Sequence, residues 1–362
     1  MNIIKINDTS NKLFYIGGIV RDEILGKDSF DIDITYIGNA IEYCSKFGEV
    51  IRENPEFGTV RVNVNGKEVD FASTRSENYP RKGHLPVVNK IGCSLKEDVM
   101  RRDFTINALA KSVTTGEIID YTGGLEDIKN KKLRILHDNS FIDDPTRIIR
   151  GLKFSIRFGF ELDEHTKKLQ NKYLNNINYD MSYKRVKKEL IETFNLNSQK
   201  AFEKFINEKI YKLITPNNVK LPNINIEELV NNYLLNNSSH IWLIYVGVLG
   251  DLSRLPLTKT EQKILNDIPK IEPKTDFEIY KMFKNLHIET ILLYAILKNE
   301  QIAKYYLNNL RKIKIQITGK DLKNLGIKPS PKYQKIFDYV LKQKLKNPKM
   351  TKNDEIEYLK NL

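Results

Sequence analysis

The sequence between residues 15 and 36 reads YIGGIVRDEILGKDSFDIDITY, and it predicts a turn, a helix and a strand in that order. A glycine pair, Gly17 and Gly18, precedes IVRDEIL, which has helical character and ends at Gly26. A glycine turn that enters a helix exposes backbone N–H groups and lets a phosphate approach closely. Arg21, one turn into the helix, adds a donor for charge-assisted contacts. We therefore interpret Gly17, Gly18 and Arg21 as nucleotide contacts, although a glycine pair alone is also typical of a plain tight turn.

Residues 30–36, FDIDITY, alternate between apolar and polar side chains, which predicts a half-buried strand that begins at Phe30. Because side chains two apart on a strand point to the same face, we expect Asp31 and Asp33 to project together. Such a pair can hold Mg²⁺, a hard ion that prefers oxygen ligands. Alone, the pair is more often a solvated strand face, so its specificity comes from the glycine turn that precedes it.

A third carboxylate follows in the predicted hairpin TVRVNV–NG–KEVDFAS, residues 59–73. Asn65-Gly66 between two alternating segments is a strong signal for a two-residue turn. Asp70 lies on the polar face of the second strand. Three carboxylates on adjacent strands are the set that a two-metal site needs to align an attacking hydroxyl and a leaving pyrophosphate. We therefore predict Asp31, Asp33 and Asp70 as catalytic residues, with Asp31 and Asp33 as metal ligands.

Residues 94–110, SLKEDVMRRDFTINALA, predict a helix that begins with Ser94 as N-cap and Glu97 completing a capping box. On this helix Asp103 and Asn107 are four apart and share one face. They are placed to hydrogen-bond a ribose, while Arg102 reaches a phosphate. An ordinary amphipathic surface helix explains the same residues equally well when they are taken alone.

Residues 143–150, DDPTRIIR, predict a second helix that Pro145 begins and that carries a polar stripe. The stripe consists of Asp144, Arg147 and Arg150, and it offers an acceptor beside a fork of donors. Cytosine and adenine both present an amine donor beside a ring-nitrogen acceptor, whereas uracil and guanine present the reverse. The stripe thus predicts acceptance of CTP and ATP and rejection of UTP and GTP. A simple ion pair within the helix is the alternative.

The periodicity of apolar residues divides the chain into an α/β part and a helical part, which predicts an α+β protein. Strand patterns dominate up to about residue 135, and helical periodicity follows. We expect a catalytic head at residues 1–137, a helical neck at 138–200 and a helical body and tail at 201–362. Between residues 304 and 352 there are fourteen Lys or Arg residues against two acids, interleaved with tyrosines that either pack or stack. This basic segment predicts a surface that grips RNA phosphates.

Composition limits the class of protein. The chain has 362 residues, 40% of them hydrophobic and 29% charged, and a formal net charge of +13. The charge favours a polyanionic partner, although a Lys-, Asn- and Ile-rich proteome produces the same bias. Two cysteines without ligand spacing favour the cytoplasm and argue against structural zinc. We expect no membrane span, no signal peptide and no stable protein partner.

Five of these elements, in order over roughly residues 13–190, resemble the class II tRNA nucleotidyltransferases, the bacterial CCA-adding enzymes and related poly(A) polymerases. The matching stretches are YIGGIVRDEILG…DIDIT, SLKEDVMRRDFTINALA, DYTGGLEDI, FIDDPTRIIRGLKFSIRFGF and SYKRVKKEL. In the last of these, the resemblance implies that Arg185 and Glu189 are structural, an i,i+4 pair.

The resemblance implies a polymerase β-like nucleotidyltransferase head followed by a helical neck, body and tail. It implies transfer of C and A residues from CTP and ATP to the 3′ end of tRNA without a nucleic-acid template, with Mg²⁺ as cofactor. A poly(A) polymerase and a CC-only or A-only adding enzyme share the motifs and remain open. A catalytically silent RNA-binding protein is the alternative outside enzymes.

Overall fold

The computed structural model describes residues 6, 8–29, 31–234 and 238–360, so the predicted start of a strand at Phe30 lies outside the described residues. The chain forms two compact units. The first unit comprises Met1–Thr193, Lys200–Val219 and Ser253–Pro256, and the second comprises Phe194–Gln199, Lys220–Leu252 and Leu257–Leu362. The predicted boundaries after residues 137 and 200 stay predictions.

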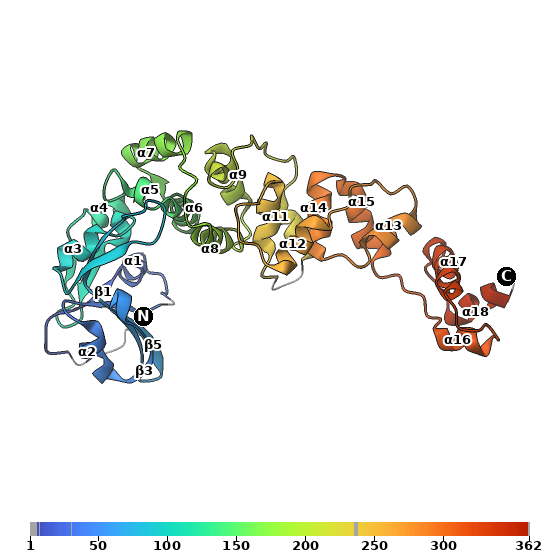
Figure 1. Cartoon of the computed structure of the whole chain (residues 1–362), viewed down its shortest axis with the longest axis horizontal. Coiled ribbons are helices and arrows are strands. Elements are labelled where there is room, and N and C mark those ends of the chain that lie inside the picture. Colours follow the sequence, from blue (N-terminus) through green and yellow to red (C-terminus); the bar gives the residue numbers. More distant parts are fainter. Residues whose placement is uncertain (1–5, 7, 30, 235–237, 361–362) are drawn as a thin grey trace. The chain divides into compact units, whose positions relative to one another are not determined.

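A seven-stranded mixed sheet organises the first unit (Figure 1), in the order β3-β4-β5-β2-β1-β8-β9. Strands β2 and β5 run parallel, and the other neighbours run antiparallel. The strands of this sheet are β1 Leu13–Ile16, β2 Asp33–Tyr36, β3 Glu49–Asn54, β4 Thr59–Val64, β5 Lys67–Ser73, β8 Leu109–Ser112 and β9 Ile118–Asp120. Two small sheets complete the strands, a hairpin of β6 Arg75–Asn78 with β7 Val87–Ile91 and a parallel pair of β10 Lys132–Leu133 with β11 Glu161–Leu162.

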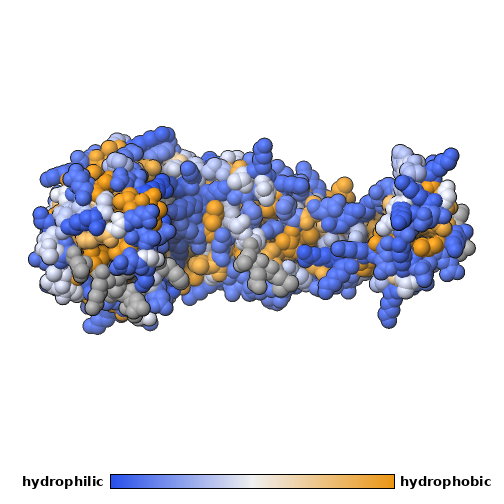
Figure 2. Space-filling view, turned by 90° about the horizontal axis from the view of Figure 1, so that it is seen from below, coloured by the Kyte–Doolittle hydropathy of each residue, from blue (hydrophilic) through white to orange (hydrophobic). Residues whose placement is uncertain are grey.

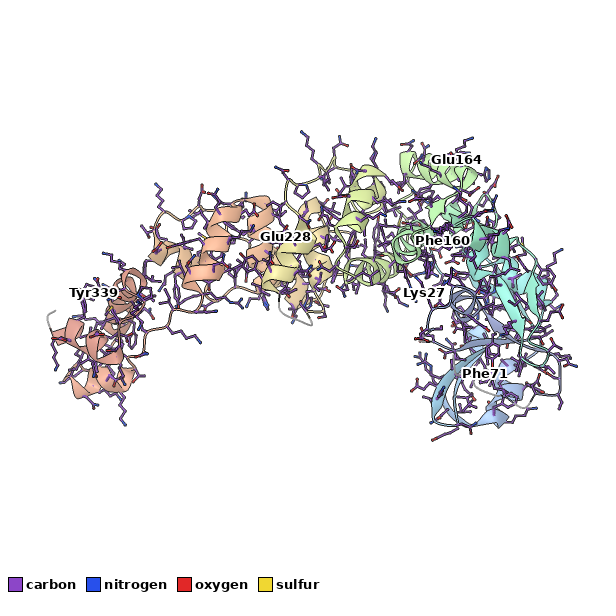
Figure 3. All side chains as sticks on the ribbon, turned by 180° about the vertical axis from the view of Figure 1, so that it is seen from behind. Lys27, Phe71, Phe160, Glu164, Glu228 and Tyr339 are labelled. Atoms are coloured by element: carbon purple, nitrogen blue, oxygen red, sulfur yellow. The ribbon has the colours of Figure 1, made fainter. Side chains whose placement is uncertain are left out.

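The predicted hairpin at residues 59–73 is confirmed, and it shows how local chemistry sets the register. Asn65 and Gly66 both have positive φ, 53° and 81°, as a tight turn that matches the twist of the strands requires. Val64 therefore pairs with Lys67, and the register continues to Thr59 opposite Ala72. Phe71, labelled in Figure 3, is fully buried in the resulting core.

Two predicted elements are shorter in the structure than the sequence pattern suggested. The strand begins at Asp33, so Asp31 precedes it; the Asp31 carbonyl accepts a hydrogen bond from the Ser29 hydroxyl instead of pairing with a neighbouring strand. The helix capped by Ser94 and Glu97 is confirmed at its start but ends at Met100. The prediction of one helix that carries both Asp103 and Asn107 was wrong, because α3 ends before Asp103 and Asn107 lies in a separate 3₁₀ turn, Thr105–Asn107.

Helices carry the rest of the first unit and its connection to the second (Figure 1). They are α1 Gly18–Ile24, α2 Ala40–Cys44, α3 Leu95–Met100, α4 Gly124–Lys129, α5 Ser140–Asp143, α6 Thr146–Phe158, α7 Glu164–Asn175, α8 Tyr183–Phe194 and α9 Gln199–Asn207. Short 3₁₀ turns lie at Ser45–Phe47, Pro55–Phe57, Thr105–Asn107, Ile210–Leu213 and Gly247–Leu249. The α+β fold class predicted from the sequence is confirmed.

The described part of the second unit is helical. Its elements are α10 Ile226–Tyr233, α11 Ile241–Val246, α12 Lys259–Asn266, α13 Asp276–Phe283, α14 Ile288–Leu297, α15 Glu300–Tyr305, the π-helix η6 Tyr306–Leu310, α16 Gly319–Asn324, α17 Lys332–Lys346 and α18 Lys352–Lys360. None of the helices in the described part of the chain has the length and apolarity that a bilayer crossing requires.

The basic C-terminal segment has a small hydrophobic core of its own. Leu322, Val340 and Leu359 form this core with Tyr333 and Tyr339 packed against it, so these two tyrosines pack rather than offer free rings for stacking. Figure 3 labels Tyr339 on α17. In Figure 2 the visible face of the C-terminal helices α16–α18 is mostly hydrophilic, with a small hydrophobic area.

Candidate active site

The glycine turn lies between β1 and α1, and its shape depends on Gly17. Gly17 has φ +73°, which side chains other than glycine rarely adopt, and its N–H donates to the Leu109 carbonyl at 3.0 Å. A Cβ built on Gly17 would lie 3.0 Å from Nη1 of Arg102. The bare backbone of Gly17 thus leaves room for the Arg102 guanidinium beside the turn, which brings two of the predicted nucleotide contacts together.

The three predicted catalytic carboxylates come from the edge of β2 and from β5. Asp33 is the first residue of β2 and lies opposite Asp70 on the parallel strand β5. Asp31 is exposed, and together with Asp70 and Arg61 it lines a cavity of about 310 Å³. The fold therefore brings all three residues to one edge of the sheet, although only two of them are strand residues.

The electrostatics of this edge favour a cation. Burial and, to a smaller extent, the negative charges of Asp70 and Asp31 together raise the pKa of Asp33 to about 6, against the opposing effect of Arg102. The charge of Asp70 is neutralised by Arg61. Its Nε donates to one carboxylate oxygen of Asp70 and its Nη2 to the other, each at 2.7 Å. A divalent ion placed among these oxygens would relieve the same repulsion, so the donor set fits a hard cation.

The side chains as they stand do not form a closed metal site. Within the described residues, no group of three or more His, Cys, Asp or Glu side chains lies close enough to hold a metal ion. The bidentate contact between Arg61 and Asp70 accounts for part of this arrangement. Both carboxylate oxygens of Asp70 are thus occupied by Arg61 in this structure.

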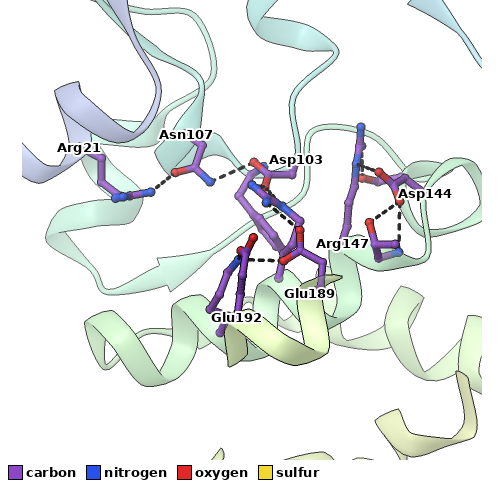
Figure 4. A network of polar contacts seen from close by, with 12 residues as sticks. Arg21, Asp103, Asn107, Asp144, Arg147, Glu189 and Glu192 are labelled. Carbon is purple, nitrogen blue, oxygen red and sulfur yellow. Dashed lines mark hydrogen bonds and ion pairs between the residues drawn. The ribbon is translucent and has the colours of Figure 1, made fainter. Parts of the chain in front are cut away.

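The predicted ribose-binding residues lie in a chain of polar contacts rather than along a helix face (Figure 4). Arg21 donates to the Asn107 side-chain oxygen, and the Asn107 amide donates to Asp103 at 3.0 Å. Arg150 contacts the other oxygen of Asp103 at 2.7 Å and Glu189 at 3.2 Å. Residues predicted from three separate motifs are thus joined in one network.

This network determines the charge state of its central carboxylate. Burial by itself would raise the pKa of Asp103, but the charge of Arg150 and the hydrogen bond from Asn107 hold it well below its ordinary value. Arg21 is only 4% exposed, contacts Asp22 at 2.7 Å and has its guanidinium 4.3 Å from the centre of the Phe158 ring. The Arg21 guanidinium, predicted as a nucleotide contact, binds protein groups in this structure.

The predicted base-selecting pair, Asp144 and Arg147, lies at the start of α6, and both side chains are already bonded. Asp144 accepts hydrogen bonds from the Thr146 N–H at 3.1 Å and hydroxyl at 2.6 Å, although the N-cap position of α6 itself is Pro145. Arg147 donates to the Ser140 hydroxyl at 2.6 Å and the Arg101 carbonyl at 3.0 Å. The two side chains are 3.9 Å apart, so acceptor and donors lie side by side as predicted.

Helix α8 supplies partners that the sequence analysis placed differently. Arg185 contacts Asp144, and Glu189 contacts Arg150 and Lys153, so both residues reach across to α6. The predicted i,i+4 pairing of Arg185 with Glu189 was wrong in this respect, because Arg185 pairs with Asp144, just before α6, and Glu189 pairs with Arg150 and Lys153 on α6. Figure 4 shows Glu189 between the two helices.

The predictions from the sequence omitted two further residues of the site, Asp98 and Arg61, although their spacing in the sequence indicates the partners of each. Asp98 is fully buried and accepts hydrogen bonds from Arg101 at 2.8 Å and Arg102 at 3.3 Å, which follows from its i,i+3 and i,i+4 spacing to them. Arg61 is found by counting back from the Asn65-Gly66 turn, because the residue opposite it in the hairpin is Asp70.

Comparison with known proteins agrees with this geometry. Residues 13–134 match the Poly A polymerase head domain. An A-adding tRNA nucleotidyltransferase of Aquifex aeolicus is 33% identical over 88% of this chain and 43% of its own length, and a CCA-adding enzyme of Bacillus pumilus is 28% identical over 97% and 93%. A solved structure of a CCA-adding enzyme in an apo form superposes with a TM-score of 0.81 and 26% identity over 97% of this chain and 92% of that one. This chain therefore spans less than half the length of the Aquifex relative.

The first unit accordingly carries a nucleotidyltransferase head on a mixed sheet. The chain is thus similar, over most of its own length, to A-adding and CCA-adding tRNA nucleotidyltransferases, and residues 13–134 match the Poly A polymerase head domain.

Proposed function

We propose that this protein is a nucleotidyltransferase that adds C and A residues from CTP and ATP to the 3′ end of tRNA without a nucleic-acid template. The observation that carries the proposal is the pairing of Asp33 with Asp70 on adjacent parallel strands, next to Asp31 and close to the glycine turn. A carboxylate with a pKa of about 6 among other carboxylates is typical of a site built for a cation. The family relation and the match to CCA-adding enzymes support the same activity.

The family generally uses a divalent metal ion, and we propose Mg²⁺ held by Asp31 and Asp33, with Asp70 as a further ligand once Arg61 releases it. When bound, such ions lower the cost of deprotonating the RNA 3′-hydroxyl and stabilise negative charge on the leaving pyrophosphate. The RNA 3′-oxygen forms a bond to the α-phosphorus of the nucleotide. The bond between the α-phosphorus and the oxygen that bridges it to the β-phosphate breaks, and pyrophosphate leaves. We propose that the triphosphate approaches the bare backbone of Gly17 and binds the Gly18 N–H and the Arg102 guanidinium, which lies beside this turn.

We propose that the remaining site residues bind and select the nucleotide. Asp103 and Asn107 contact the ribose while Arg21 and Arg150 hold them in place, since both arginines already bond to that pair. Asp144 accepts from the exocyclic amine of cytosine or adenine, and Arg147 donates to the ring nitrogen. Because both side chains are bonded to protein groups now, base binding exchanges those bonds for new ones. A wrong base leaves buried polar groups unpaired and is rejected.

One experiment tests the reaction and the product. tRNA transcripts truncated before the first C, the second C and the terminal A are each incubated with one nucleoside triphosphate, and the products are sequenced. Addition of C to the first two and A to the third supports full CCA addition. Failure to extend any of the three transcripts with any triphosphate would refute the proposal.

Addition of A alone is a second candidate, because the Aquifex relative is an A-adding enzyme. In the same experiment an A-adding enzyme extends only the transcript that lacks the terminal A. The predicted cytoplasmic location rests on the two cysteines, both of which are buried free thiols, and stays a prediction.

A further inference from the structure

The second unit contains a pocket of about 280 Å³ whose described lining comes entirely from this unit. Its floor includes three aromatic residues, Tyr280, Phe283 and Tyr306. The floor also includes aliphatic side chains. Three cationic side chains complete the lining, Lys284, Arg311 and Lys314, and all three residues are exposed. The pocket therefore has an apolar base and a rim of positive charge.

The geometry of the pocket follows from a break in helical regularity. The chain passes from α15 into the π-helix η6, where the Arg311 N–H donates to the Tyr306 carbonyl at 2.8 Å. This wider turn keeps Arg311 beside the Tyr306 ring, and single π-helical turns are frequent at functional sites. The Tyr280 hydroxyl donates to the Ile313 carbonyl at 2.9 Å, which fixes the chain next to Lys314. The two sides of the rim are thus held by backbone contacts.

The charge at this rim is uncompensated. Among the residues that the structure describes, none forms an ion pair or a side-chain hydrogen bond with Lys284, Arg311 or Lys314, and the pocket lining includes no acid. The acid whose pKa Lys284 influences, Asp338, is already paired with Lys281 at 2.9 Å. Three cations held around one cavity repel one another, and an anion bound among them removes that repulsion.

We propose that this pocket binds a backbone phosphate of the RNA substrate, an inference that rests on the proposed function. Phe283 and Tyr306 are almost fully buried, and their ring centres lie 5.2 Å apart, so they offer no free face on which a base can stack. The rim recognises the charge of the phosphate and leaves the base unread. Contacts of this kind position an RNA without reading its sequence.

The test removes the rim charge from the full-length chain and measures RNA binding against salt. The variant Lys284→Ala/Arg311→Ala/Lys314→Ala is compared with wild type, using fluorescence anisotropy of a tRNA transcript that lacks its last three nucleotides. We expect the affinity to fall about tenfold and the slope of log affinity against log salt to become shallower by about one. A second RNA hairpin of unrelated sequence should lose affinity by the same factor.

The matched control is Lys259→Ala/Lys263→Ala/Lys270→Ala, which removes the same charge from three other exposed positions of the second unit. It should bind RNA within about twofold of wild type. Equal losses in the two variants would show that net charge, and not the pocket, holds the RNA. If the rim variant loses binding of labelled ATP but binds RNA as wild type does, the pocket is assigned to a free nucleotide. If the rim variant binds both RNA and ATP as wild type does, the phosphate pocket is refuted. Thermal unfolding of each variant, and of Lys314→Ala alone, excludes misfolding as the cause.

Nucleotide addition by the wild type is measured on the same preparation, which separates the two proposals. If the wild type adds no nucleotide but the rim variant loses RNA affinity, the proposed function fails and the phosphate pocket stands. If the wild type extends tRNA and the rim variant binds RNA as tightly as wild type, only the pocket is refuted.

Discussion

Asp33 and Asp103 are both enclosed carboxylates of the first unit, yet their pKa values are displaced in opposite directions. Asp33 lies among other carboxylates, and its pKa is raised to about 6. Asp103 lies between Asn107 and Arg150, and its pKa is lowered. Their surroundings differ in exposure as well. Asp31, which lies near Asp33, is exposed, whereas Arg147, which lies near Asp103, is 3% exposed.

The opposite pKa shifts of Asp33 and Asp103 indicate that the two sides of the site have different tasks. The sheet edge at β2 and β5 leaves Asp33 among other carboxylates with a raised pKa, which suits a side that a ligand completes. The side formed by α6 and α8 has satisfied its polar groups with protein partners, which suits a side that holds a fixed shape. Substitutions at the sheet edge should therefore affect catalysis more than stability, and substitutions beside α6 should affect both.

The largest expected effect is the loss of activity in Asp33→Asn. Removing this charge from the proposed cation site should lower the rate of nucleotide addition at least about a thousandfold, or about 4 kcal/mol of transition-state stabilisation. The fold should persist, because the amide relieves repulsion from Asp70 and Asp31. Asp28→Asn, an exposed acid before the same strand, serves as the control. Wild-type turnover by Asp33→Asn would contradict the assignment of this side of the site.

The next effect is expected at Arg147, on the opposite side of the comparison. Arg147→Met removes the hydrogen bonds to the Ser140 hydroxyl and the Arg101 carbonyl and one ion-pair partner of Asp144, so the free energy of unfolding should fall by about 2–4 kcal/mol. Misincorporation of U should rise relative to C, measured on the transcript that lacks the first C. Arg157→Met removes a half-exposed arginine from the same helix and should cost less than about 1 kcal/mol. Unchanged discrimination between CTP and UTP would argue against the base-selecting role.

The pH dependence of stability provides a third, smaller test. The folded chain keeps the Asp33 proton up to a pH of about 6, whereas the unfolded chain releases it near the ordinary value of 3.8. Between these values the folded state binds more protons, so the free energy of unfolding falls as the pH rises, by on the order of 2–3 kcal/mol in total. Asp33→Asn should lack this decline when urea unfolding is compared between pH 4 and 7. A carboxyl signal of Asp33 that titrates near 4 by NMR would show that the repulsion is absent.

The elements that the sequence predicted well are those fixed by local chemistry. The Asn65-Gly66 turn and the Ser94 capping box depend on residues within a few positions, and both are present. The stretch from Gly17 to Asp33 likewise brings its residues to one edge of the sheet. Arg61 was predictable in the same way, by counting from the turn.

The bonded state of the arginines was not predictable, because their partners come from distant parts of the chain. Arg21 meets Asn107, 86 residues away, and Arg147 meets Tyr79, 68 residues away. Helical spacing suggested that Asp103 and Asn107 share a face, and they do contact each other, but Asp103 follows the end of α3 and Asn107 lies in a separate 3₁₀ turn. The pattern identified the right residues and the wrong backbone, since only tertiary contacts decide which donor a buried carboxylate takes.

The smallest effect is expected at Arg61. Its ion pair with Asp70 bonds a carboxylate of the proposed site at the sheet edge to an arginine, as Asp103 is bonded to one beside α6. Arg61→Ala removes the bidentate contact to Asp70, but the two side chains are 45% and 41% exposed, so the loss of stability should stay below about 1 kcal/mol. Because Arg61 occupies the oxygens of Asp70 that a cation would use, its removal should tighten binding of Mn²⁺ a few-fold in calorimetry of the free protein. Arg52→Ala, on the neighbouring strand opposite Arg61, removes the same charge and leaves Asp70 bonded. Weaker Mn²⁺ binding in Arg61→Ala than in Arg52→Ala would mean that Arg61 holds Asp70 in position for the ion and does not compete with it.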